Sequence, residues 1–248
     1  MAFGHGSKAT LYMMGLNATG YLNDISMDGS VETAEVTVLG NTGKSYIPGL
    51  QDASMKLSGF FDGNNLIDTN TFSYTVDAYS RGPSQPLASV IYLPQGDGNN
   101  VNGYGFQGQV NKDTVKTAVN AAGTVEVDLQ SSTGWEGGYV TAPLTARSAV
   151  SGTTAVIDNL ASSSNGLSAF LVCTAVAGTA SPTLTFTIQH SADNVTYVPL
   201  VAFTAQTAAG DQRVSVAPGT TINRYIRGSW AISGTTPSFT FSSLVSRK

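Results

Sequence analysis

Few residues in this 248-residue sequence could carry out chemistry, and those few stand apart from one another. The two histidines lie in a glycine-rich stretch (His5) and just before the polar turn SADN (His190), without the clustered carboxylate or thiol partners that a metal or catalytic site requires. The single cysteine, Cys173, alternates with Leu171 and Ala175, which is typical of a buried strand position. We therefore expect no catalytic residue, no metal site and no cofactor.

Two glycine-rich motifs match known ligand loops only in part. QGDGNN at 95–100 lacks the repeated acids and the closing glutamate of a calcium loop. GYGFQG at 103–108 has glycine spacing like that of nucleotide-binding motifs, but no helix is predicted after it to offer its N-terminus to a phosphate. We interpret both motifs as loop or strand segments, and we expect that the protein is not an enzyme.

Two acids are spaced so that they lie on one face of a strand. Glu126 and Asp128 are two residues apart within the predicted strand 124–129, and alternate residues of a strand point to the same side. Such a pair could act as general acid and base, or it could simply belong to a solvated sheet surface. We favour the solvated surface, because no other reactive residue accompanies the pair.

The charge of the chain is low and unevenly distributed. Only 11% of the residues are charged, and the net charge is −4. Residues 1–140 contain 13 acidic and 6 basic residues, whereas residues 141–248 contain 3 acidic and 6 basic ones. Neither part has the cluster of Lys and Arg that a nucleic-acid-binding face requires. The sequence also has no apolar segment typical of a signal peptide or a membrane span, so we expect neither.

Short β-strands are predicted along nearly the whole chain, which indicates a mainly-β fold. The segments are rich in β-branched or aromatic residues and are bounded by Gly, Asn, Asp or Pro. In the first half they are 9–14, 20–26, 31–39, 53–61, 88–93, 104–111 and 124–129. The stretch 64–82 has apolar residues at mixed spacings of four and five, and it predicts one helix.

The composition changes around residues 134–153, where glycines and a proline predict a linker or strap. We therefore divide the chain into a domain at 1–137, a linker at 138–152 and a second domain at 153–248. Strands at 166–177, 183–190, 196–204, 212–216, 222–232 and 238–245 are spaced as in a β-sandwich. Leu184, Phe186 and Ile188 share one face, while Tyr225 and Arg227 point away from the face of Ile226, Trp230 and Ile232.

The segment VETAEVTVLGNTGKSYIPGLQDASMKLSGFFD, at 31–62, resembles the signature of the major tail tube proteins of long-tailed bacteriophages. In both, a strand with acids and threonines is followed by a loop that contains Gly and Lys. An aromatic residue, Pro-Gly-Leu and an acid come next. The motif closes with an alternating strand that ends in Gly, aromatic residues and Asp. The matching positions are Glu35, Thr37, Gly40, Lys44, Tyr46, Pro48, Gly49, Leu50, Asp52, Leu57, Gly59, Phe61 and Asp62. The resemblance extends over residues 5–135 and includes the segment 103–134.

This resemblance implies a β-barrel or sandwich with one flanking helix, whose subunits join edge to edge into homohexameric rings. The rings stack into a tube through which DNA and the tape-measure protein pass without sequence-specific binding, and tail terminator and tail-tip proteins close the tube. Asn41 and the matching positions other than Leu57 and Gly59 would make ring and stacking contacts, with Pro48-Gly49 forming a turn. Leu57 and Gly59 would anchor the sheet. Glu126 and Asp128 would face the lumen. The implied location is the virion tail, assembled in the host bacterial cytoplasm without a membrane.

The second half has two interpretations that the sequence leaves open. It resembles a β-sandwich extension found at the end of some phage tail proteins, and Tyr197, Tyr225 and Arg227 could then offer a surface for sugars. Alternatively, the similar segments 115–129 and 201–216 indicate a diverged second tail tube domain, and three chains would then close a ring. A different class of protein, a capsid or tail decoration or a carbohydrate-binding β-sandwich, is the alternative to a tube subunit.

Overall fold

A computed structural model describes residues 6–39, 42–61, 72–81 and 85–248. Among these residues the fold is mainly β with one α-helix, which confirms the predicted fold class. The first elements are η1 (Gly6–Lys8), β1 (Thr10–Met13), β2 (Leu16–Asn17), η2 (Ala18–Tyr21), β3 (Leu22–Glu35), β4 (Tyr46–Phe60), α1 (Phe72–Arg81), β5 (Ala88–Leu93) and β6 (Asn102–Ala118). They are followed by β7 (Ala121–Arg147), β8 (Ser151–Thr153), β9 (Ile157–Asp158), β10 (Leu167–Ser191), β11 (Val198–Ala202), β12 (Gly210–Val216) and β13 (Tyr225–Arg247).

The strands of the first half form a sheet in the order β3-β4-β7-β6-β5-β1, and every neighbouring pair is antiparallel. One face of this sheet is apolar because alternate residues such as Met55, Leu57, Val127 and Leu129 point to the same side. These side chains are buried in one hydrophobic cluster together with residues of α1 and β5.

The helix covers the apolar face of this sheet. Phe72 and Val76 are four residues apart, so they lie on one side of α1, and both are buried in the cluster. At the helix end, Ser80 and Arg81 donate hydrogen bonds to Asp113 of β6. The prediction of a helix over 64–82 is therefore confirmed for 72–81, while 64–71 and residue 82 lie outside the described residues.

The segment predicted as a linker is mostly strand, so that expectation was wrong at the level of secondary structure. β7 continues without a break to Arg147, and its last part pairs with β13. Glycines had suggested an irregular segment, but Gly138 lies where strands pack closely. A methyl group at Gly138 would overlap the carbonyl oxygen of Val245, so only glycine lets the two backbones approach. The division into two domains stays a prediction.

The second half forms a β-sandwich from two long, bent strands. β10 and β13 pair along their whole length, and their register shifts near the middle. Gly178 and Gly234 have positive φ angles there, and each lies opposite a proline of the other strand, Pro237 and Pro182. The bend places both halves of each strand around one core, where the rings of Phe186 and Phe241 are 5.3 Å apart.

The alternation predicted for the second half is confirmed by burial. Leu184, Phe186 and Ile188 are buried on the inner side, as are Ile226 and Ile232. The two segments predicted as separate strands at 166–177 and 183–190 are continuous in β10, because the bend keeps its hydrogen bonds with β13 on both sides.

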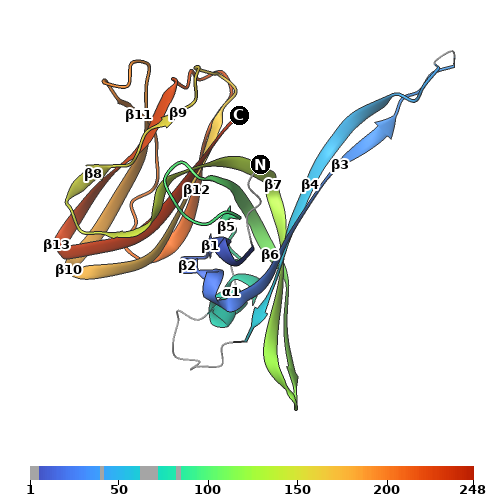
Figure 1. Cartoon of the computed structure of the whole chain (residues 1–248), viewed down its shortest axis with the longest axis horizontal. Helices are drawn as coiled ribbons and strands as arrows, with labels where there is room; N and C mark the ends of the chain where they lie inside the picture. Colours follow the sequence, from blue (N-terminus) through green and yellow to red (C-terminus); the bar gives the residue numbers. More distant parts are fainter. Residues whose placement is uncertain (1–5, 40–41, 62–71, 82–84) are drawn as a thin grey trace.

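The two halves share a third hydrophobic cluster. Tyr12, Ile91 and Leu93 of the first half pack with Val140 of β7 and with buried residues of β10 and β13, namely Phe170, Val172 and Leu244. The two halves are therefore joined through this cluster and through β7, which runs from one half to the other in Figure 1. In the same figure, two hairpins extend beyond the cores, one made by β3 and β4 and the other by β6 and β7.

Candidate functional site

The most distinctive surface is the outer part of the β3–β4 hairpin, which we call the arm (residues 28–39 and 42–53). Figure 1 shows it extending away from the rest of the molecule. Every residue of β3 from Asp28 onward is exposed, and the pairing continues outward to Glu35 and Tyr46. A two-stranded ribbon with no core of its own is at best marginally stable in water, so contact with another surface would stabilise the arm.

The arm carries large apolar side chains in contact with solvent. Leu50 is 77% exposed, and Val31, Val38, Tyr46 and Ile47 are also exposed. Tyr46 and Ile47 are consecutive strand residues, so they point to opposite faces of the ribbon. Exposed apolar surface that follows both faces of one hairpin is typical of a binding surface rather than of a free one.

Three predicted assembly residues meet at the outer end of the arm. Lys44 Nζ lies 3.0 Å from Glu35 Oε2, and Thr37 Oγ1 donates to Glu35 Oε1 at 2.9 Å. The amide of Ser45 donates to Thr37 Oγ1 at 3.0 Å. These bonds link the two sides of the hairpin beyond the last strand pair. Two other predicted residues of this loop, Gly40 and Asn41, lie outside the described residues.

Pro48 and Gly49 do not form the turn that the sequence predicted. Both lie within β4, where the register shifts between Val31 and Thr33 on the partner strand. Gly49 packs against Glu32, and a methyl group there would lie 3.2 Å from the Glu32 carbonyl oxygen. A proline without an N–H group and a glycine without a side chain are suited to such a bulge on a strand edge.

The remaining predicted assembly residues are spread along β4 and its end. Leu50 is exposed on the arm, and Asp52 accepts a hydrogen bond from Gln130 of β7. Phe61 is exposed beyond the end of β4, and its amide donates to the Gly123 carbonyl at 2.9 Å. Asp62 lies outside the described residues. The predicted set is therefore divided between the outer arm and the opposite end of the sheet.

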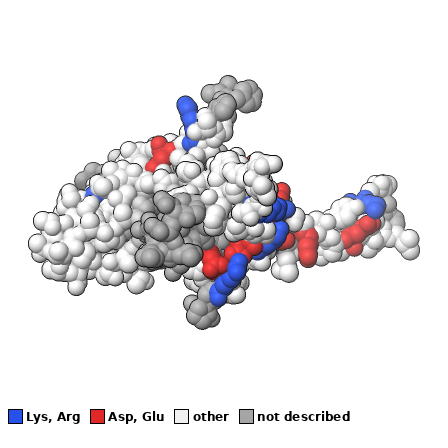
Figure 2. Space-filling view, turned by 90° about the horizontal axis from the view of Figure 1, so that it is seen from below, with Lys and Arg blue, Asp and Glu red and all other residues white. Residues whose placement is uncertain are grey.

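The sheet face opposite the core is hydrophilic across four strands. The register places the following charged residues on this polar face: Asp24, Asp28, Asp52, Lys56, Lys112, Lys116, Glu126 and Asp128. Five acids and three lysines leave a net charge of −2 among them. Figure 2 shows acidic and basic side chains gathered on this part of the molecule and along the arm.

The structure confirms that Glu126 and Asp128 share a face, and it adds partners that sequence reasoning missed. Lys116 pairs with Glu126, and Lys112 Nζ lies 4.0 Å from Asp128 Oδ2. The hydrogen bond from Lys116 lowers the pKa of Glu126, so this carboxylate stays ionised. The sequence signal that could have predicted these ion pairs is the presence of lysines on one strand, β6, and acids on the next strand, β7. The paired acids form a solvated face rather than an acid–base pair.

This sheet has two open edges, one along β3 and one along the outer part of β6. Within the described residues, β3 hydrogen-bonds to β4 alone, and the outer part of β6 after Val110 pairs on one side only, with β7. An open edge presents unpaired N–H and C=O groups that another strand can complete. Two open edges on opposite sides of one sheet allow the sheet to be extended in both directions.

The predicted surface residues of the second half lie together on the outer side of the sandwich. The guanidinium of Arg227 lies 3.7 Å from the ring centre of Tyr197 and donates to Gln189 at 2.9 Å. Arg224 lies 4.8 Å from the ring centre of Tyr225. Each tyrosine ring therefore has an arginine on one face, and both tyrosines are partly exposed.

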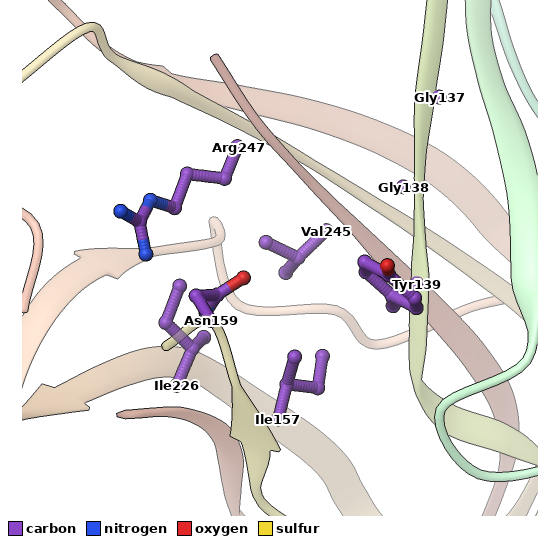
Figure 3. A pocket seen from close by; sticks show the side chains of 8 residues that line it. All are labelled: Gly137, Gly138, Tyr139, Ile157, Asn159, Ile226, Val245 and Arg247. Atoms are coloured by element: carbon purple, nitrogen blue, oxygen red, sulfur yellow. The ribbon is translucent and has the colours of Figure 1, made fainter. Parts of the chain in front are cut away.

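Two cavities formed by described residues are small. One, of about 80 Å³, lies where the sandwich meets β7 and is lined by Tyr139, Ile157, Asn159 and Arg247 among others (Figure 3). It is large enough for a few water molecules but not for a sugar or nucleotide. Another, of about 220 Å³, lies beside the start of β3 and is lined by Leu22, Asp24 and Tyr92.

The described part of the chain contains no group of three or more His, Cys, Asp or Glu side chains that could hold a metal ion. None of its helices is long and apolar enough to cross a membrane. Burial of Cys173 raises the pKa of its thiol to about 11, so the thiol stays protonated, as expected for a core residue.

No family model and no curated protein matches this sequence. Among the solved structures similar to this chain are tail components of phages and of a gene transfer agent. The tail of an empty gene transfer agent particle is 16% identical, with a TM-score of 0.41, over 54% of this chain and 97% of that chain. The SPP1 tail tube is 10% identical, with a TM-score of 0.42, over 54% and 78%.

Another similar structure covers nearly the whole chain. The SPP1 Dit protein, described as a hub of the adsorption apparatus in phages that infect Gram-positive bacteria, is 11% identical, with a TM-score of 0.37, over 96% of this chain and 98% of that chain. Because identities are this low and the TM-scores lie below 0.5, these likenesses assign no function to the chain.

Proposed function

We propose that this chain is a structural subunit of a bacteriophage tail, which assembles with copies of itself into rings that stack as a tube. One observation carries the proposal. A single sheet has a buried face, a hydrophilic face, two open edges and a projecting arm with exposed apolar side chains. Such a sheet is completed only by neighbours, and its hydrophilic face is suited to line a water-filled channel.

Ring closure would use the open edges. β3 carries Asp24, Asp28, Glu32 and Glu35, while the outer part of β6 carries lysines 112 and 116. When the β3 edge of one copy meets the β6 edge of the next, backbone hydrogen bonds continue the sheet. The acids of β3 favour this pairing over contact between two β3 edges, where like charges would meet. Repetition of one such contact gives a ring of six copies, or of three if the second half acts as another tube domain.

Stacking would use the arm. Its apolar residues project beyond the subunit and would be buried against the adjacent ring, with the end of the arm held in shape by Glu35, Thr37 and Lys44. The polar face, with its net charge of −2, would face the lumen, where its acidic side chains repel DNA phosphates. DNA and the tape-measure protein would pass without specific binding, between terminator and tip proteins, in the virion tail.

The second half would lie outside the tube. Tyr197, Tyr225 and Arg227 face outward from the sandwich, and a stacking surface that includes tyrosine and arginine is compatible with a sugar of the cell surface. This is the second candidate role. Binding of soluble glycans that is abolished by Tyr225→Ala, with the fold unchanged, would support it.

Charged substitutions on the arm test the assembly proposal. The double variant Ile47→Asp, Leu50→Asp should remain a folded single subunit and lose high-order assembly, because both side chains are exposed in the free chain and would be buried in the stack. Analytical ultracentrifugation measures assembly, and circular dichroism checks the fold. Val150→Asp, at an exposed apolar position of the second half, is the matched control. Equal assembly of the double variant and the control would reject the arm contact.

A further inference from the structure

A carboxyl group of the second half is held by two elements of the first half. Asp211 lies on β12, which pairs with β10 at an edge of the sandwich. The hydroxyl of Tyr79 in α1 donates to Asp211 Oδ1 at 2.9 Å, and the amide of Ser89 in β5 donates to Oδ2. The assembly model gives these contacts no role, since they lie within one chain and away from the arm.

The surroundings of this carboxyl group disfavour its charge. Desolvation by burial is the main cause that raises the pKa of Asp211 to about 6, and the hydrogen bonds from Ser89 and Tyr79 offset only part of it. Burial and the nearby Asp211 also raise the pKa of Tyr79, so this tyrosine stays a neutral donor.

Among the residues that the structure describes, no cation is paired with Asp211. From α1 it meets Tyr79, from β5 the Ser89 amide, and from β10 its register partner Val172. Arg213 is two residues further along β12, but its guanidinium donates to Glu136 at 2.6 Å and to Ser168 at 2.8 Å. The other cation near Glu136 is Lys248, at 3.7 Å. The charge of Asp211 is therefore balanced by hydrogen bonds alone.

We propose that Asp211 is a protonation-sensitive latch that holds β12 against α1 and β5, tightening the joint between the two halves on acidification and loosening it towards neutral pH. The latch works without large rearrangement, because β12 is an edge strand and a neutral carboxyl group can keep both contacts without the cost of a buried charge. It does not depend on tube assembly, so failure of one proposal leaves the other standing.

The direction of the pH effect on latching follows from proton binding. The folded, latched chain binds the Asp211 proton up to about pH 6, whereas the released carboxyl group has its ordinary pKa of 3.8. Between these values the latched form holds more protons, so latching weakens as pH rises through this window and stays weak above it. The two pKa values limit the change in the latching equilibrium to about a hundredfold.

Hydrogen exchange of the Ser89 amide in the full-length chain, corrected for the intrinsic pH dependence, tests the latch. We expect its protection to fall by about tenfold between pH 5 and pH 7.5, close to the limit that the two pKa values set over this range. Asp211→Asn should remove this pH dependence. Asp77→Asn, which neutralises an exposed acid of α1, should retain it. The same pH profile in the wild type and in Asp211→Asn would overturn the proposal.

Two further measurements distinguish a latch from a purely structural contact. Tyr79→Phe removes a hydrogen bond that favours the carboxylate, so the pH midpoint of the change in Ser89 protection should move to higher pH. An unchanged or lower midpoint would contradict the latch. Should Asp211→Asn fail to fold, the ¹³C chemical shift of the Asp211 carboxyl carbon is titrated in the wild type. A midpoint near 6 would support the proposal, and one below 4.5 would overturn it.

Discussion

At the scale of single residues, the least exposed ion pair of the described chain lies at the joint between the two halves. Glu136 and Arg213 have side chains that are 5% and 13% exposed, and they are joined at 2.6 Å. One oxygen of Glu136 and the Nε atom of Arg213 are buried without a protein partner. The pair therefore depends strongly on both members, because either charge alone would be left buried.

Loss of one member of this pair should be costly. We expect Arg213→Ala to lower the free energy of unfolding by about 3 kcal/mol, measured by urea denaturation, since Glu136 would keep only the more distant Lys248. Arg224→Ala removes an ion pair with Asp158 in which both side chains are 41% exposed, and it should lower the free energy of unfolding much less. Equal costs would show that enclosure does not control the strength of these pairs.

At the scale of elements, the sequence predicted alternating strands better than it predicted their ends. β5 was predicted with its observed bounds, because Gly, Pro and Asp residues flank a short apolar run. β7 was divided between a strand and a linker, since its glycines carry no side chain from which a period could be read. Pro48 and Gly49 were assigned to a turn, because a bulge depends on the register of the partner strand.

The candidate site was predicted only in part, because strand register places some of its residues. The alternation of Glu126 and Asp128 was visible within one strand, but the lysines that pair with them come from β6 and are placed by register. Glu35, Thr37 and Lys44 were named from the resemblance to tail tube proteins, and the bonds that join them within the hairpin were not predicted. Asp211 was not foreseen, because its partners are more than a hundred residues away in the chain.

Two adjacent glycines of β7 test the close packing at the element scale. Gly138→Ala should destabilise the fold by about 2 kcal/mol or more, because the added methyl group meets the Val245 carbonyl. Gly137→Ala is the matched control, since its nearest neighbour would be a Tyr104 ring carbon at 4.0 Å, and we expect a change within about 0.5 kcal/mol. Thermal unfolding of both variants measures the difference. Similar melting temperatures would contradict the packing constraint.

At the scale of the whole molecule, the two halves are joined more firmly than a flexible linker would allow. They share β7, a hydrophobic cluster around Phe170, and the polar contacts of Asp211 and Arg213. A chain cut near residue 140 would expose the apolar side of this joint. In a tube, the sandwich would therefore hold a fixed position relative to the sheet instead of swinging freely on its surface.

The central claim is that copies of this chain surround a channel, and end-on electron microscopy of the purified protein at high concentration tests it most directly. We expect rings with an open centre that stack into hollow tubes, with sandwiches projecting outward, and six or three subunits in each ring. Rings that never stack would favour a hub over a tube. A compact oligomer with no central channel would contradict the proposed function.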